Sequence, residues 1–172
     1  MEKMVTSAYA NKLLKQLEED RAYWRKLENE SDTYLAASNE EPVIPAYDYE
    51  TVSATLADID RKAARIKHAI NLYNTTTVLE LEDGTAMTID EALVVMAQLN
   101  SRKSKLDTMR KRLPKDRASA IYRGGNTLVE YRYVNYDPER VKADFESISA
   151  RVMDIQLKLD QANQTIMFPV DL

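Results

Sequence analysis

Apolar residues recur at alternating spacings of four and three in two segments of the chain, which is the pattern of a narrow helical seam. One seam lies within residues 48–73 and the other within residues 137–166. Residues 3–37 and 89–113 carry looser apolar stripes with charged residues between them, as expected of amphipathic helices. A segment with two prolines, 39–46, separates the first two helices. The pattern therefore predicts four long helices, which pack best as an elongated antiparallel bundle.

Between the second and third helices the apolar pattern changes to the alternation of β-strands. Residues 77–88 contain Asp83-Gly84 between two extended runs, and this dipeptide favours a hairpin turn because it adopts positive φ angles. Residues 127–135 alternate in the same way and predict a further strand. Because so few strands cannot form an independent sheet, we expect them to pair at one end of the bundle or with a second subunit.

Local signals place two helix starts and the end of the chain. Thr88 and Glu91 form a capping-box pattern, so a helix is expected to begin directly after Thr88. Asp137 followed by Pro138 combines an N-cap side chain with a proline suited to the first helical position. The residues around Phe168 form an extended tail with an apolar anchor.

The composition agrees with a folded, mainly α protein of one domain over residues 1–172. Hydrophobic residues make up 44% and charged residues 30%, a balance that suits a globular chain rather than a disordered one. Only 3 glycines and 5 prolines are present, which favours long helices over many turns. The net charge of -4 gives no general attraction for nucleic acid, so we do not expect a nucleic-acid partner.

Several classes of site are excluded by the residues that the sequence lacks. There is no cysteine, so disulfides, thiolate metal sites and cysteine nucleophiles are excluded. His68 is the only histidine, and no carboxylate residue lies at a sequence spacing that would fix it beside the imidazole. Neither a metal site nor a cofactor is therefore predicted. No segment has the roughly 20 apolar residues that span a bilayer, and no signal peptide is recognisable. We therefore expect a cytoplasmic protein without a membrane partner.

A series of short motifs follows a recognisable order along the last two-thirds of the chain. It consists of Ile70-Asn71-Leu72-Tyr73-Asn74 with Thr77, then Asp83-Gly84, Ala92-Leu93, Tyr122, Leu159-Asp160 and Gln164. In this order the chain resembles a family of small bacterial and phage proteins, some of which are called septicolysins. The resemblance implies long helices with a small β element and a tendency to assemble, but no particular chemistry. The chain departs from the family at Met96-Ala97 and Met167-Phe168, where an Arg-Asp and an Asn-Trp pair would be expected.

A basic cluster stands out in this acidic chain. Between positions 102 and 123 only Asp107 and Asp116 are acidic, and the basic residues are Arg102, Lys103, Lys105, Arg110, Lys111, Arg112, Lys115, Arg117 and Arg123. One interpretation is a solvated helix face that balances acidic neighbours. The other is an anion site, because guanidinium and ammonium groups match phosphate in geometry and charge. The candidate ligand-binding residues are Arg102, Arg110, Arg117, Tyr122, Arg123, Asn71 and Asn74.

Two hypotheses of function follow from these patterns. The first is a non-enzymatic binding or assembly protein, a helical bundle that forms a homo-oligomer through its seams and its β element. The alternative is a sequestering protein, of phage origin, that binds a nucleotide or another phosphate-bearing small molecule between subunits. A carboxylate-based hydrolase or transferase is a weaker third hypothesis, because no credible pair of residues can be named. Narrow apolar stripes with charged outer faces argue against membrane lysis.

Overall fold

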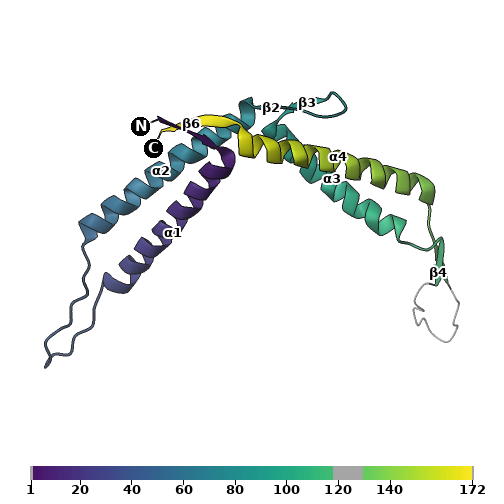
Figure 1. Cartoon of the computed structure of the whole chain (residues 1–172). Coiled ribbons are helices and arrows are strands. Elements are labelled where there is room, and N and C mark those ends of the chain that lie inside the picture. Colours follow the sequence, from purple (N-terminus) through teal and green to yellow (C-terminus); the bar gives the residue numbers. More distant parts are fainter. Residues whose placement is uncertain (1, 118–129, 172) are drawn as a thin grey trace, which may run out of the picture. The chain divides into compact units, whose positions relative to one another are not determined.

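The structure is a computed structural model that describes residues 2–117 and 130–171 (Figure 1). Its described part is mainly helical and has four helices, which confirms the predicted fold class: α1 (Ser7–Ser31), α2 (Tyr49–Thr76), α3 (Ile89–Arg110) and α4 (Pro138–Thr165). The chain divides into two compact units. The first contains the residues up to Val78 and from Asp160 onward, and the second contains Leu79–Leu159. The last turns of α4 therefore belong to the first unit.

Short strands form three separate two-stranded sheets within the described residues. The strands are β1 (Glu2–Thr6), β2 (Val78–Glu80), β3 (Ala86–Thr88), β4 (Lys115–Arg117), β5 (Tyr131–Tyr133) and β6 (Met167–Asp171). They pair as β1 with β6, β2 with β3, and β4 with β5. None of these strand pairs has a hydrophobic core of its own. Each sheet therefore only holds together the two segments that it contains, at a chain end or at a loop.

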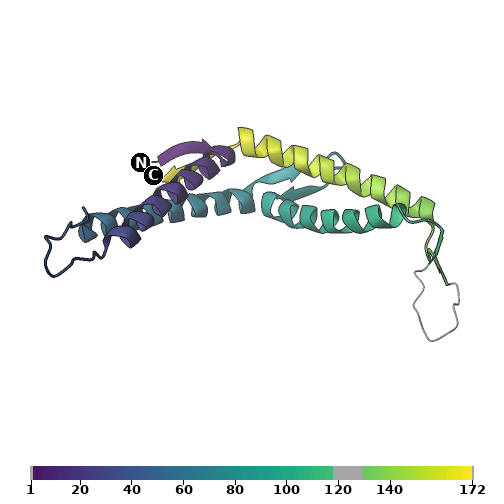
Figure 2. The same cartoon turned by 90° about the horizontal axis from the view of Figure 1, so that it is seen from below.

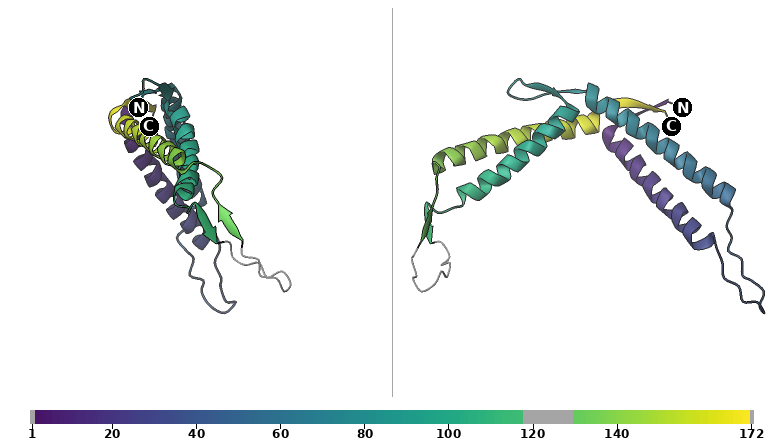
Figure 3. Two further views of the ribbon diagram at one scale, coloured as in Figure 1. Left: turned by 90° about the vertical axis from the view of Figure 1, so that its right-hand side faces the viewer. Right: turned by 180° about the vertical axis from the view of Figure 1, so that it is seen from behind.

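The first unit is built on the helical hairpin of α1 and α2, which lie side by side (Figures 1 and 2, and the right-hand view of Figure 3). The seam of α2 packs inward, because every seventh residue along it, Val52, Ile59, Ile66 and Tyr73, is buried. An ion pair between Arg21 Nε and Asp60 Oδ1, 3.0 Å apart, links the two helices.

The first residues of the chain form a strand, so the predicted helix over 3–37 is wrong at its start. β1 pairs antiparallel with β6, and Val5 lies opposite Phe168 in the register. Both side chains are buried, so this pairing of two distant segments outweighs the weak helical preference of the N-terminus. The helix begins at Ser7, after Thr6 accepts a hydrogen bond from the Tyr9 amide as its N-cap.

The second unit contains the β2–β3 hairpin, α3 and the larger part of α4. The predicted turn is confirmed, because Gly84 has a φ of 79° and the Thr85 amide donates to Asp83 Oδ1 at 2.9 Å. α3 and α4 run side by side in opposite directions (Figure 1). The tip of the hairpin contacts α4 at Arg151, whose guanidinium lies 3.7 Å from Asp83 Oδ2.

The helix starts predicted from local signals are confirmed. α3 begins at Ile89, and the Thr88 amide donates to the Glu91 carboxylate at 2.9 Å, as the capping-box pattern predicted. α4 begins at Pro138, and Asp137 Oδ1 accepts from the Glu139 amide at 2.9 Å. The helix ends agree less well, since α1 and α3 end several residues before the predicted positions 37 and 113.

Candidate functional site

The end of α3 is tied to the segment after β5 by one hydrogen bond, in which the Tyr136 hydroxyl donates to the Met109 carbonyl at 2.7 Å. A second bond joins the residues that flank the two strands, because the Val134 amide donates to the Pro114 carbonyl at 3.2 Å. The Met109 carbonyl, in the last turn of α3, also accepts from the Arg112 amide at 3.1 Å. Tyr136 therefore adds a second bond to the helix end and holds the segment after β5 beside it.

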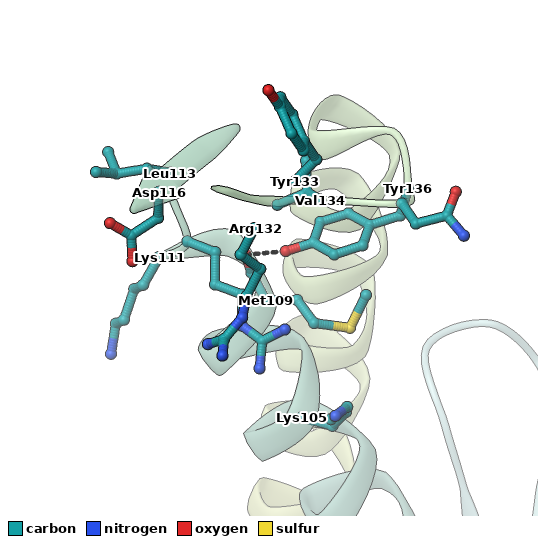
Figure 4. A pocket seen from close by; sticks show the side chains of 11 residues that line it. Lys105, Met109, Lys111, Leu113, Asp116, Arg132, Tyr133, Val134 and Tyr136 are labelled. Atoms are coloured by element: carbon teal, nitrogen blue, oxygen red, sulfur yellow. Dashed lines mark hydrogen bonds between the residues drawn. The ribbon is translucent and has the colours of Figure 1, made fainter. Parts of the chain in front are cut away.

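A cleft of about 620 Å³ lies at this end of α3, between the helix and the β4–β5 pair (Figure 4). Four of its lining residues are basic, namely Lys105, Lys111, Arg112 and Arg132, and one is acidic, Asp116. The remaining lining residues are Met109, Leu113, Tyr133, Val134, Asn135 and Tyr136. The cleft thus combines an excess of positive charge with apolar and aromatic surface.

The basic residues near the cleft differ in whether a carboxylate forms an ion pair with them. Asp107 forms ion pairs with Lys111 and with Arg110, whose Nη2 lies 2.7 Å from Asp107 Oδ1. Hydrogen bonds from Lys111 and then from Arg110 hold the pKa of Asp107 below its ordinary value. By contrast, the described residues offer no ion-pair partner to Arg112, Arg132 or Lys105.

The tyrosines of β5 are held by one cation on the neighbouring strand. The Lys115 ammonium lies 4.1 Å from the ring centroid of Tyr131 and 5.6 Å from that of Tyr133. Lys115 lies opposite Tyr133 in the register, so these three side chains share one face of the β4–β5 pair, and Arg132 lies on the other face. Although Tyr133 is among the lining residues, its ring therefore turns away from Arg132 (Figure 4).

The three described arginines nominated from the sequence do not line this cleft. Arg110 lies over the ring of Phe145 of α4, 4.1 Å from its centroid, and therefore serves the packing of the two helices. Arg102 is exposed on α3, and Arg117 is exposed in β4 opposite Tyr131.

The other nominated residues lie elsewhere. Asn71 and Asn74 belong to the last turns of α2, in the first unit, where the Asn71 carbonyl accepts from Thr75 Oγ1 at 3.0 Å. Tyr122 and Arg123, and the first part of the predicted strand 127–135, lie outside the described residues.

The sequence did not identify Arg132 as a site residue. It indicated Lys105, Lys111 and Arg112 only as members of the basic cluster between positions 102 and 123. The strand alternation separated Arg132 from the tyrosines on either side of it, so nothing pointed to a shared site. The signal that places it is the antiparallel register of β4 and β5, in which Arg132 lies opposite Asp116, another lining residue of the cleft.

No metal centre or bilayer-spanning segment is found in the described ranges. No three acidic or histidine side chains there are grouped closely enough to hold a metal ion. None of the helices described is both long and apolar enough to cross a membrane. His68 is exposed on α2, where it borders a shallow groove of about 480 Å³ with Tyr73 and Phe168.

Comparison with known proteins shows a shared fold. No known protein family matches the chain, so its resemblance to the septicolysins stays a prediction. No curated protein matches it either. Among solved structures, the chain is similar to a functionally unknown conserved protein from Corynebacterium diphtheriae, with a TM-score of 0.59 and 13% sequence identity. The match covers 96% of this chain and 99% of the other, so the likeness extends over nearly the whole of both proteins.

Proposed function

We propose that this chain is a non-enzymatic assembly protein that forms a homo-oligomer through the outer face of α3. The observation that carries the proposal is a run of ten residues in α3, 92–101, that contains no charged side chain. A helix that is apolar around its whole circumference is normally buried on all sides, and residues 92–97 are all apolar. In the single chain this stretch is buried on one side only, which supports a partner on the other.

The exposed side of this stretch is apolar. Leu93 is 44% exposed and Val94 is 58% exposed, and Ala97 lies one turn further along the same side. A groove of about 510 Å³ beside Val94 and Val95 extends toward β3, where Asp90 and Glu91 also line it. We name the surface formed by Leu93, Val94 and Ala97 the outer face of α3. Contiguous apolar surface of this kind typically marks an interaction site.

A second copy of the chain is the partner that suits this face best. In a two-fold dimer the same patch meets itself, so a patch that carries charge would meet like charge. The outer face of α3 has no charged side chain within residues 92–101. It can therefore meet the same face of a second copy without charge repulsion. We expect the assembly to form in the cytoplasm, in keeping with a sequence that has no cysteine.

The test compares two double variants by light scattering coupled to size-exclusion chromatography, from micromolar to hundreds of micromolar protein. Leu93→Glu with Val94→Glu introduces charge on the outer face of α3 and should give monomers. Leu35→Glu with Val43→Glu changes the same residue types where they are 100% and 89% exposed, in the linker, and should leave the assembly intact.

Burying a leucine or valine stabilises a contact by about 1.5–3 kcal/mol, so the α3 variant should weaken association at least a hundredfold. Circular dichroism of both variants checks that helix content is unchanged. A native chain that is monomeric at every concentration contradicts the proposal. Equal loss of assembly in both double variants contradicts it as well, because the effect would then not belong to the outer face of α3.

A further inference from the structure

We infer that the cleft between the end of α3 and β5 is a binding site for a small phosphorylated molecule. The inference rests on residues of the second unit alone and does not depend on the proposed assembly. Its main support is that Lys105, Arg112 and Arg132, which line one cleft, have no ion-pair partner among the described residues.

Within the part of the chain that the structure describes, only two cations near the end of α3 are compensated, Arg110 and Lys111, which share Asp107. Arg102 likewise has no ion-pair partner among the described residues, so what distinguishes Lys105, Arg112 and Arg132 is that they line one cleft. The single acidic residue of the cleft, Asp116, forms no ion pair with any of the three within the described residues. The cleft therefore keeps an excess of positive charge that an anion would balance.

Phosphate fits the chemistry of this lining better than other anions do. Guanidinium groups donate two parallel hydrogen bonds to phosphate oxygens, and a lysine adds a compact point charge. Arg112 follows α3, whereas Arg132 lies in β5, so the two forks approach from different segments of the chain. Two forks from separate segments suit an anion with several oxygens, such as a diphosphate.

The apolar side of the cleft leaves room for the rest of the ligand. Tyr136 lies against Met109 with its hydroxyl held by the Met109 carbonyl, whereas the ring of Tyr133 turns to the other face of β5 (Figure 4). A volume of about 620 Å³ also lies within the range of small-molecule sites, about 300–1,000 Å³.

The overall charge distinguishes a small ligand from nucleic acid. The chain has a net charge of -4, so its excess of positive charge is confined to the basic cluster around the cleft and does not extend over the length that a long polyanion needs. A molecule with one or two phosphates engages only the local cations. The structure therefore favours a nucleotide-sized ligand.

The experiment measures binding of inorganic pyrophosphate and of adenosine diphosphate to the full chain by calorimetry. Both probes should bind, and Arg132→Ala should weaken each about ten- to hundredfold, since a lost charged hydrogen bond has an effect of this size. Arg112→Ala, a change in a different segment, should act in the same direction. The matched control is Arg102→Ala, which removes an exposed arginine of α3 outside the cleft and should change binding less than about twofold.

Tyr133→Leu is a second control, because the ring of Tyr133 lies on the face of β5 opposite to Arg132. It should change the binding of either probe less than about twofold. Circular dichroism verifies the fold of every variant. The inference is overturned if neither probe binds at millimolar concentration. Equal weakening by Arg102→Ala and Arg132→Ala also overturns it, because the cations would then act only through general surface charge.

Discussion

The ring of Tyr73 in α2 stacks on the ring of Phe168 in β6, with centroids 4.7 Å apart and an angle of 23° between the planes. The two residues lie far apart in the sequence, and both are buried, with exposed fractions of 3% and 7%. Offset stacking of this kind contributes beyond simple burial. The contact therefore fastens the C-terminal strand to the helical hairpin of the first unit.

Phe168→Ala should destabilise the protein by about 3–5 kcal/mol, because it leaves a cavity against Tyr73 and Val5. Unfolding in urea, followed by circular dichroism, measures the change. Met167→Ala is the control, since Met167 is the neighbouring residue and is 60% exposed, and it should change stability by less than about 0.5 kcal/mol. Similar losses in the two variants would show that the stacked pair does not anchor β6.

Tyr73→Phe should leave the stability unchanged or raise it by up to about 1 kcal/mol. The Tyr73 hydroxyl is buried and has no hydrogen-bond partner in the structure, so its removal eliminates an uncompensated polar group while the ring stays. Thermal unfolding at neutral pH provides the measurement. A clear loss of stability would mean that the hydroxyl makes a bond that matters to the fold.

Alkaline conditions should destabilise the first unit through the same residue. Burial raises the pKa of Tyr73 above its ordinary value, so the folded state holds the phenolic proton more tightly than the unfolded state. This stability is complete below about pH 10, the ordinary pKa of tyrosine, and declines as the pH rises above it. Tyr73→Phe should therefore lose less stability between about pH 10 and 11 than the native chain or the exposed-site control Tyr23→Phe.

Thr88→Ala should destabilise the protein by about 1 kcal/mol, because Thr88 is the N-cap of α3 and part of its capping box. Thr108→Ala serves as the control, since Thr108 lies inside the same helix and its hydroxyl only bonds back to the Ser104 carbonyl. That change should be neutral or slightly stabilising, as alanine is the better helix former. Urea unfolding of the two variants should therefore give effects that differ in size and in sign.

Gly84→Ala should destabilise the β2–β3 hairpin by about 1–2 kcal/mol. Gly84 has a φ of 79°, which L-residues with a Cβ adopt only with strain, whereas a methyl group there would meet no atom within 4 Å. The loss is therefore one of backbone conformation and not of packing. Gly84→Asn should cost less than Gly84→Ala, because asparagine tolerates positive φ, and equal losses would contradict this account.

The elements that were predicted correctly are those with local signals. Asp137 and Pro138 mark the start of α4, and Asp83-Gly84 marks the turn of the hairpin, each through contacts within a few residues. The four-three seam of α2 likewise predicted a buried face that the structure confirms at Val52 and Ile59. That all four helices pack together as one antiparallel bundle stays a prediction, because the chain divides into two units and each is compact by itself.

The candidate site was predicted only in outline. The basic cluster was visible in the sequence, yet helix geometry turns Arg110 onto Phe145 and leaves Arg102 outside the cleft. The residue that joins the cleft from the other side, Arg132, comes from β5. A cluster in sequence thus did not identify which of its members share a site in space.

The sequence by itself determined the helices, the hairpin and the absence of cysteine chemistry, because caps, turn dipeptides and apolar periodicity act over a few residues. Only the tertiary structure decided that Glu2–Thr6 is a strand, because its partner β6 lies at the other end of the chain. It also decided that Lys105 and Arg132 line one cleft. Both outcomes depend on contacts between residues far apart in sequence, which local preferences do not specify.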